Sequence, residues 1–400
     1  MEEQREKHSN LQFHIFICLV GVIFVLLCVF VWMKPDEKYS VSERRLLKQM
    51  PELSKETVLS GRFMSAFEEY SLDQFPARDT FRSMKARTSL TLDNNGIYVV
   101  EDEIDGESCK VICDMEYPLN EDSLQYAAKR FQSVYDMYLE NSDCQVYLSI
   151  VPDKNYFYGT ENGYLSMDYG KLVDIMLEGN SNMTYIDIFP YLSAEDYYRT
   201  DIHWRQEKLA DVADVLLGGM GQGIGNLETE VQGTEEVEQV TSEKNVTIQT
   251  RYRTMTVEGD FYGVYHGQAA LPIAPDSLQY LTNNMIEQMK VFDYQNNKEI
   301  PVYDKEKIEG DDPYELYVGG PISLATIENP ACDNGKHLII FRDSFGSSIA
   351  PLLAQGYEKT TLIDIRYILP SVLGQYVDFQ DADVLFLYST PVLNHSDVLK

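Results

Sequence analysis

Five short apolar runs, rich in β-branched and aromatic residues, most constrain how this chain can fold. Each run is four to six residues long and nearly uninterrupted by polar side chains. Strands that are covered on both faces require such runs. The runs are residues 146–151, 185–189, 338–341, 361–365 and 384–388. Helix-like stretches at 122–139 and 206–217 lie among them, so the sequence predicts an α/β fold with a mostly parallel sheet flanked by helices.

The composition indicates a folded protein and argues against nucleic acid as a partner. Apolar residues make up 44% of the 400 residues and aromatic residues 12%, which is enough for a sizeable core. The chain has 64 acidic and 33 basic residues, giving a net charge of −31. A surface this negative repels a phosphate backbone.

The N-terminal segment predicts a membrane anchor. Residues 11–33 contain no charged side chain, and as a helix they would span roughly 34 Å, enough to cross the hydrocarbon core. The run is long for a cleaved signal peptide and is not followed by a small-x-small cleavage pattern. We therefore expect a single-pass protein of the cell membrane, with residues 1–10 as a cytoplasmic tail. The flanking charges do not fix its orientation, and we place the acidic bulk on the extracytoplasmic side because we find no second span.

Two further segments can be distinguished beyond the predicted span. Residues 34–72 combine charges with apolar residues at helical spacing, which predicts a stalk or leading helix. Residues 73–400 are expected to form the exported domain. Within it, residues 218 to about 275 open with a glycine string and then become acidic and rich in Thr and Val, which predicts a β-rich insertion. The glycine string follows a helix and lacks the Lys-Ser/Thr ending of a phosphate loop.

The cysteines outside the span leave the disulfide state open. Cys109 and Cys113 could close a small loop, and together with Cys144 and Cys332 they allow two bridges. A single C-x3-C pair without a second matching pair is a poor zinc signal, so we expect no metal. We expect no other cofactor either.

Two short segments carry the residue types of nucleophilic catalysis. Residues 200–204 read Thr-Asp-Ile-His-Trp and precede a helix-like stretch, whereas residues 341–346 read Phe-Arg-Asp-Ser-Phe-Gly and follow an apolar run. A serine at a strand-to-helix turn projects its hydroxyl from the carboxyl edge of the sheet, where α/β folds build their sites. The same turn exposes backbone N–H groups that can hold an oxyanion.

Ser344 is therefore a candidate nucleophile, and it requires a base. Asp201 and His203 supply a carboxylate and an imidazole two residues apart, so both can face one site and the carboxylate can orient the ring. None of the other histidines beyond residue 33 has a carboxylate two residues before it. Structural alternatives stay open at this point, because an Asp-Ser pair also caps helices and an Asp-x-His pair also forms local hydrogen bonds.

Together with further segments, these motifs resemble the DHHW family of bacterial exported proteins, which is similar to the SGNH-like alginate O-acetyltransferases. The resemblance covers nearly all of the expected exported domain and implies an SGNH-hydrolase-like fold. It implies that Ser344 is the nucleophile, His203 the general base and acid, and Asp201 the carboxylate that orients the ring. The additional segments are residues 75–79, 95–98, 259–263 and 342–388, with Asp-Ile-Arg-Tyr at 364–367 inside the last.

Two positions depart from the pattern that the resemblance implies. Ile202 stands where the family name has a first histidine, which matters little if only the second is catalytic. Arg342 stands where many SGNH enzymes carry glycine, so the oxyanion hole need not contain the same donors as in those enzymes. We assign only the backbone N–H of Ser344 to it.

The resemblance implies an O-acetyltransferase or acetylesterase that acts on an exopolysaccharide or cell-wall glycan through an acyl-serine intermediate. Trp204, Arg366 and Arg342 are the candidate substrate contacts. A packing role for Trp204 and an ion pair for Arg366 are the structural alternatives. Transfer would require an acyl donor, such as a multi-span membrane acyltransferase partner. Two rival functions remain: a non-catalytic glycan-binding or assembly protein that retains the fold, and an exported serine peptidase.

Overall fold

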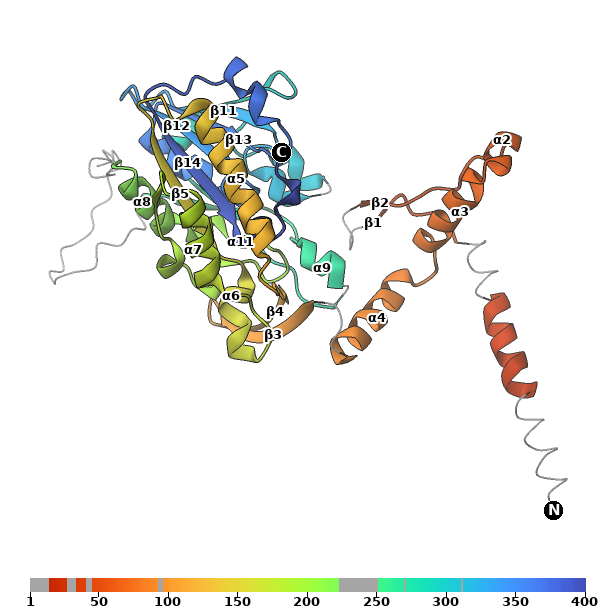
Figure 1. Ribbon diagram of the computed structural model, residues 1–400. Coiled ribbons are helices and arrows are strands. Elements are labelled where there is room, and N and C mark those ends of the chain that lie inside the picture. The colour runs from red at the N-terminus through yellow and green to blue at the C-terminus, as the bar shows by residue number, and fades with distance from the viewer. Residues whose placement is uncertain are drawn as a thin grey trace, which may run out of the picture. The chain divides into compact units, whose positions relative to one another are not determined.

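The computed structural model describes residues 14–26, 34–40, 45–92, 96–222, 251–269, 271–310 and 312–400. The chain divides into two compact units (Figure 1). The larger unit consists of residues Asn95–Tyr265 and Ile273–Lys400, and the smaller of Met1–Asn94 and His266–Pro272.

An eight-stranded mixed sheet forms the centre of the larger unit, in the order β10-β9-β11-β13-β12-β14-β5-β6. The strands from β13 to β6 pair in parallel, whereas β11, β9 and β10 join the sheet through antiparallel pairs. The expected parallel core is thus present, and the antiparallel edge is an addition to it. The strands are β5 (Gln145–Val151), β6 (Thr184–Tyr185), β9 (Lys290–Asp293), β10 (Lys298–Ile300), β11 (Leu324–Glu328), β12 (His337–Arg342), β13 (Lys359–Ile363) and β14 (Ala382–Ser389).

One of the five predicted strands is largely wrong. The run 185–189 contributes only Tyr185 to β6, and its last residue already belongs to the 3-10 turn η2 (Phe189–Tyr191). Pro190 stands at the start of this turn, and its fixed φ angle and missing N–H favour a turn over a strand at this position.

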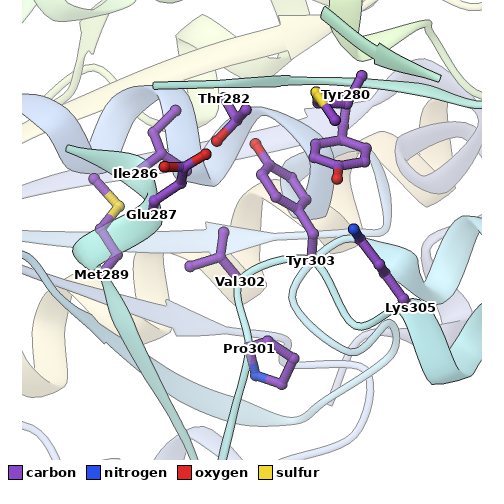
Figure 2. Close-up of a pocket in the computed structure, with 10 residues that line it drawn as sticks. Tyr280, Thr282, Ile286, Glu287, Met289, Pro301, Val302, Tyr303 and Lys305 are labelled. Atoms are coloured by element: carbon purple, nitrogen blue, oxygen red, sulfur yellow. The ribbon is translucent and has the colours of Figure 1, made fainter. Parts of the chain in front are cut away.

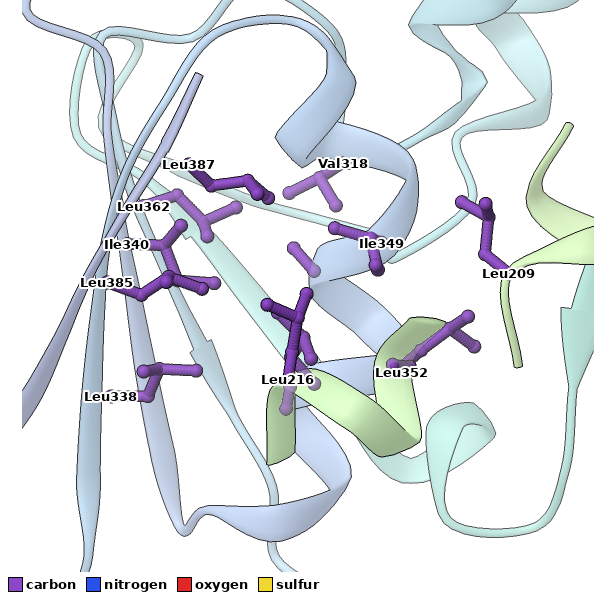
Figure 3. Close-up of a cluster of buried hydrophobic side chains, with 14 of the residues drawn as sticks. Leu209, Leu216, Val318, Leu338, Ile340, Ile349, Leu352, Leu362, Leu385 and Leu387 are labelled. Atoms are coloured by element: carbon purple, nitrogen blue, oxygen red, sulfur yellow. The ribbon is translucent and has the colours of Figure 1, made fainter. Parts of the chain in front are cut away.

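Helices cover both faces of the sheet, which explains the uninterrupted apolar runs (Figure 1). Along β12, Leu338 and Ile340 pack with side chains of α8 (Ala210–Gly219) and α10 (Phe345–Leu353), as Figure 3 shows. The alternate residues Ile339 and Phe341 pack on the other face with side chains of α5 (Glu121–Tyr138) and α7 (Tyr169–Gly179). The predicted helix 122–139 is confirmed as α5. The predicted helix 206–217 is split into η4 (Gln206–Lys208) and α8.

Two strand pairs of the larger unit lie outside the large sheet. Strands β3 (Ile97–Ile104) and β4 (Glu107–Asp114) are joined by Asp105 and Gly106, which both have positive φ angles, 53° and 81°. Strands β7 (Arg253–Thr256) and β8 (Gln279–Thr282) pair antiparallel. This second strand pair begins inside the expected insertion, 218 to about 275, and ends beyond it. Residues 223–250 of that segment lie outside the described residues.

Cys109 and Cys113, one of the possible disulfide pairs, are not bonded to each other. Both residues lie on β4, and all five described cysteines are free thiols. Four residues of extended strand span roughly 13 Å, well beyond the Cα separation that a disulfide tolerates.

Short helices connect the remaining elements of the chain. In addition to those named above, the structure contains α6 (Lys154–Tyr158), α9 (Val264–Ala269) and α11 (Thr390–Asn394), and the 3-10 turns η1 (Thr160–Asn162), η3 (Ala194–Asp196), η6 (Ile286–Gln288), η7 (Lys305–Glu309), η8 (Pro313–Leu316), η9 (Ala354–Gly356), η10 (Pro370–Gln375) and η11 (Ser396–Val398).

The smaller unit is mainly helical, but its helices are short. The predicted leading helix, 34–72, is broken: Ser54 caps α2 (Lys55–Leu59), and Gly61, with φ 78°, separates α2 from α3 (Arg62–Asp73). A third helix, α4 (Arg78–Leu92), extends past the expected boundary at residue 72, and a short strand pair, β1 (Tyr39–Ser40) with β2 (Arg45–Leu46), precedes the helices.

The predicted membrane span can be followed only in part. Residues 14–26 are helical with exposed side chains, whereas the rest of the expected span and the tail 1–10 lie outside the described residues. Among the residues that the structure describes, no helix is both long enough and apolar enough to cross a membrane.

Candidate active site

Ser344 lies at the turn between β12 and α10, as the sequence predicts. Its backbone is helical, with φ −64° and ψ −26°, and α10 begins with the next residue. The buried carboxylate of Asp343 holds this turn, because Oδ1 accepts the N–H of Phe345 at 3.0 Å and Oδ2 accepts the N–H of Ser389 at 2.7 Å. The turn is so tight that a Cβ atom at Gly346 would lie 2.5 Å from Arg342 Cβ.

His203 and Asp201 meet Ser344 across 141 residues of sequence. The Nε2 atom of His203 lies 2.8 Å from Ser344 Oγ, and its Nδ1 atom lies 2.5 Å from Asp201 Oδ1. Because a carboxylate only accepts hydrogen bonds, this arrangement assigns the proton to Nδ1 and leaves Nε2 to accept the serine proton. The three groups are ordered carboxylate, imidazole and hydroxyl.

The imidazole is enclosed by aromatic rings. The ring of Tyr314 stacks on His203, with centroids 3.8 Å apart and an interplanar angle of 9°, and the ring of Phe345 lies 4.9 Å away. Tyr314 is fixed in turn by a 2.8 Å hydrogen bond between its hydroxyl and Ser348 Oγ, and burial raises its pKa well above the usual value. His203 is only 7% exposed, and low surrounding polarity strengthens its hydrogen bond to Asp201.

The loop that carries Asp201 is braced by Gly263, Val264 and Asp276. The second carboxylate oxygen of Asp201 accepts the N–H of Val264 at 2.7 Å. Gly263 packs so closely that a Cβ atom there would lie 2.3 Å from Asp201 Cβ. Asp276 accepts the backbone N–H and the hydroxyl of Thr200, at 2.8 and 2.6 Å. These contacts fix the carboxylate on the side away from His203.

A buried lysine, which the sequence analysis missed, supports the same loop. Lys154 follows β5 at the carboxyl edge of the sheet and is 1% exposed. Its ammonium group donates to the carbonyl oxygens of Tyr198 at 2.9 Å, Arg199 at 3.4 Å and Ile112, and lies 4.7 Å from the centre of the Tyr265 ring. Burial lowers the pKa of Lys154, although nearby acidic groups oppose this shift. A charged residue directly after a buried strand, at the sheet edge where sites form, was the available signal.

Two of the predicted substrate contacts are buried framework residues. Trp204 has no exposed surface, and its Nε1–H lies 3.1 Å from the carbonyl oxygen of Phe345 and 2.8 Å from Ser348 Oγ. Arg342 is equally buried, and its Nη2 donates to the carbonyl oxygens of Gly320 and Ile322 at 3.2 and 3.3 Å. A side chain without exposed surface offers nothing for a sugar to contact, so the prediction that Trp204 and Arg342 bind substrate is wrong for this structure.

Arg366 is held by Asp364 in a two-point ion pair. The Nε–Oδ1 and Nη2–Oδ2 distances are 2.9 and 2.7 Å. Desolvation lowers the pKa of Arg366, but the hydrogen bonds and charge of Asp364 outweigh it, and the pKa is raised. The Arg366 side chain keeps 16% of its surface exposed, so its role as a substrate contact stays a prediction.

Comparison with solved structures identifies the fold. The sequence matches no family model and no curated protein. A DHHW family protein from Eubacterium siraeum is 21% identical and superimposes with a TM-score of 0.53, covering 77% of this chain and 97% of that one. PatB1 from Bacillus cereus, in a structure with a sulfonyl adduct, is 16% identical at a TM-score of 0.53, covering 75% and 97%. The resemblance to the DHHW family is thus confirmed at the level of the fold.

Proposed function

We propose that the chain is a serine enzyme that transfers or hydrolyses ester-linked acetyl groups of an exopolysaccharide or cell-wall glycan. The alignment of Asp201, His203 and Ser344 carries this proposal, because it is the arrangement that activates a hydroxyl group as a nucleophile. The glycan and the acetyl group rest on the sequence resemblance to the O-acetyltransferases. The sulfonyl adduct of PatB1, which has the same fold, adds support, because sulfonyl electrophiles react with activated nucleophiles.

In the first half of the proposed reaction, Ser344 Oγ attacks the acyl carbonyl carbon while its proton passes to His203 Nε2. The carbonyl oxygen becomes an oxyanion, and the backbone N–H of Ser344, at the start of α10, donates to it. The intermediate then collapses: the bond to the leaving oxygen breaks, that oxygen takes the proton from His203, and the acyl group stays on Ser344. Asp201 remains ionised and stabilises the imidazolium in between.

In the second half, an acceptor hydroxyl gives its proton to His203 and attacks the acyl carbon, and Ser344 leaves with that proton. If the acceptor is a sugar, the enzyme is a transferase, and if it is water, the enzyme is an esterase. We favour transfer because of the sequence resemblance. The proposal includes a transmembrane anchor at residues 11–33 and places the enzyme domain on the extracytoplasmic side of the membrane. Because one span cannot carry acetyl groups across, it also includes an acyl donor, such as a multi-span membrane acyltransferase partner.

Intact-mass spectrometry of the detergent-solubilised full chain after brief exposure to an activated acetyl ester tests the proposal. We expect one acetyl adduct on the parent, none on Ser344→Ala, and much slower labelling of His203→Ala. Ser347→Ala is the matched control, because it changes another serine of α10 outside the triad, and it should be labelled like the parent.

An adduct that survives Ser344→Ala would contradict the assignment of the nucleophile. No adduct on the parent and no ester turnover would favour the non-catalytic glycan-binding alternative. Turnover of peptide amides but not of acetylated sugars would favour the peptidase alternative.

A further inference from the structure

A pocket in the larger unit is lined by none of the three residues of the proposed triad. Its volume is about 320 Å³, which lies within the range of small-ligand sites. It is formed by β7, β8, η6 and the residues that follow β10 (Figure 2). Its lining residues are Met255, Tyr280, Thr282, Ile286, Glu287, Met289, Pro301, Val302, Tyr303 and Lys305.

One side of the pocket combines aromatic rings with a positive charge. The rings of Tyr280 and Tyr303 lie 4.3 Å apart at an angle of 36°, and the ammonium group of Lys305 lies 5.9 Å from the centre of the Tyr280 ring. Figure 2 shows these three side chains together. In the described part of the chain, no carboxylate forms an ion pair with Lys305. Lys305 thus places an exposed positive charge at the pocket of a protein whose net charge is −31.

The opposite side of the pocket carries both apolar and polar side chains, including Thr282 and Glu287 (Figure 2). Ile286 and Met289 are buried and lie across the pocket from the tyrosines (Figure 2). Val302 lies between the two sides. Glu287 stands at this side as well, where it pairs with Arg253 at 2.7 Å. A ligand that matches both sides must combine apolar surface with several hydrogen-bonding groups.

The aromatic wall is held in place before any ligand arrives. The hydroxyl of Tyr303 donates to the carbonyl oxygen of Leu281 at 2.6 Å and lies 3.2 Å from the amide nitrogen of Gln206. The amide oxygen of Gln206 accepts the N–H of Leu281 at 2.8 Å, and its nitrogen also donates to the carbonyl oxygen of Ser348 in α10. Binding to a wall that is already ordered loses little conformational entropy.

We propose that this pocket binds one acetylated sugar residue of a glycan chain, as a subsite separate from Ser344. The sugar ring presents an apolar C–H face to Tyr280 and Tyr303, and its hydroxyl groups can bond to Lys305. The methyl of the acetyl group packs against the exposed apolar residues of the lining, Met255 and Pro301. This inference rests on the proposed function, because that function makes a glycan the ligand. It goes further in naming the place where an acetylated sugar residue binds.

The test is equilibrium binding of two tetrasaccharides to the detergent-solubilised full chain carrying Ser344→Ala. Chitotetraose has an N-acetyl group on every ring, and cellotetraose has the same linkage without acetyl groups. Met255→Trp fills the pocket from a position on β7 that is 40% exposed, where a large residue does not disturb the core. Met137→Trp, at a position on α5 that is 44% exposed, is the matched control.

We expect the parent to bind chitotetraose about tenfold or more tightly than cellotetraose, because a single buried methyl group gives discrimination of this order. Met255→Trp should weaken chitotetraose binding at least about tenfold, whereas Met137→Trp should leave it unchanged. Lys305→Ala should weaken the binding of both sugars. The inference is overturned if Met255→Trp binds like Met137→Trp, or if the parent binds neither sugar or both equally.

The labelling of Ser344 by a small acetyl ester separates this inference from the proposed function. In chains with Ser344 intact, Met255→Trp should be labelled at the parental rate, because the pocket does not contain the nucleophile. If Ser344 is labelled but chitotetraose does not bind, the subsite is refuted and the catalytic proposal stands. If chitotetraose binding depends on Met255 but Ser344 is not labelled, the catalytic proposal fails and the subsite stands.

Discussion

Replacing Gly263 with alanine would push a methyl group into the loop that carries Asp201. The added Cβ atom would lie 2.3 Å from Asp201 Cβ and 2.4 Å from both Asp201 Cα and the carbonyl oxygen of Thr200. Two of these three neighbours are backbone atoms, so no rotation of a side chain relieves the contact. The loop of Asp201 and the segment of Gly263 must therefore move apart.

The size of that movement predicts the loss of activity. Ordinary contact begins at 3.4 Å, so the two segments must separate by about 1 Å, a misplacement that typically costs about 10²-fold in rate. Asp201 is held at 2.5 Å from His203 Nδ1 and at 2.7 Å from the backbone nitrogen of Val264. At least one of these two hydrogen bonds must break when the segments separate. Overpacking of this kind also lowers the free energy of unfolding by about 1 to 3 kcal/mol.

The rate of Ser344 acetylation, followed by intact mass, measures the effect, and thermal unfolding shows whether the variant is folded. Gly218→Ala is the matched control, since no atom lies within 4 Å of a Cβ atom there. That position is within α8, so the control should be more stable by about 0.5 to 1 kcal/mol at an unchanged rate. A folded Gly263→Ala protein that is acetylated at the parental rate would refute the claim that the position of Asp201 controls the reaction.

Three further predictions concern buried groups. Lys154→Met removes a positive charge near Asp201, and loss of this charge stabilises the imidazolium of His203. The acid limb of the pH profile of the acetylation rate should therefore move to higher pH, whereas Lys154→Arg should leave it nearer to that of the parent. An unchanged acid limb in both variants would contradict this. Trp204→Phe removes two hydrogen bonds, so the free energy of unfolding should fall by about 1 to 2 kcal/mol. The KM for a glycan acceptor should stay unchanged. A raised KM in a folded variant would show that Trp204 contacts the substrate after all. Burial, together with the charge of Asp153, raises the pKa of Glu116 from 4.5 to about 7. Ionisation of Glu116 is therefore less favourable in the folded state than in the unfolded state, and the free energy of unfolding falls as the pH rises from about 4.5 to about 7. Denaturant unfolding at pH values on both sides should therefore show Glu116→Gln gaining stability relative to the parent as pH rises, and a constant difference would refute the shift.

The parallel core could be predicted from the sequence because burial on both faces leaves a direct mark. Leu338 and Ile340 face one layer of helices and Ile339 and Phe341 the other, so the four central positions of β12 must all be apolar, and such a run is visible without any tertiary information. The antiparallel edge leaves no such mark. Strands β9 and β10 carry polar residues at several positions, and only their pairing with a neighbour defines them.

The hairpin β3–β4 was missed although a signal was present. Asp105 and Gly106 form the two-residue turn that favours positive φ angles, and buried residues such as Tyr98 and Val100 alternate along β3. The acidic residues in this strand obscured the alternation. The proximity of Asp201, His203 and Ser344 could be predicted because the proposed chemistry demands particular residue types, whereas the burial of Trp204 and Arg342 is set by packing that no local pattern records.

The burial of Arg342 also accounts for the departure from glycine at this position. Its Nη1 lies 3.7 Å from Asp364, which is bound at two points by Arg366. With Asp343, which is also buried, these residues form a group of two positive and two negative charges. A buried charge is tolerated only when it is compensated, and here the compensation is complete within the group.

This charge-balanced group joins the carboxyl ends of three adjacent parallel strands. Arg342 ends β12, Asp364 follows β13, and Asp343 accepts the N–H of Ser389 at the end of β14. Ser344 is attached directly to one member of the group, so its position is set by all three strands rather than by the turn alone. Arg342, expected from sequence to contact a substrate, therefore helps to fix the position of Ser344, the proposed nucleophile, and Arg366 supports it through Asp364.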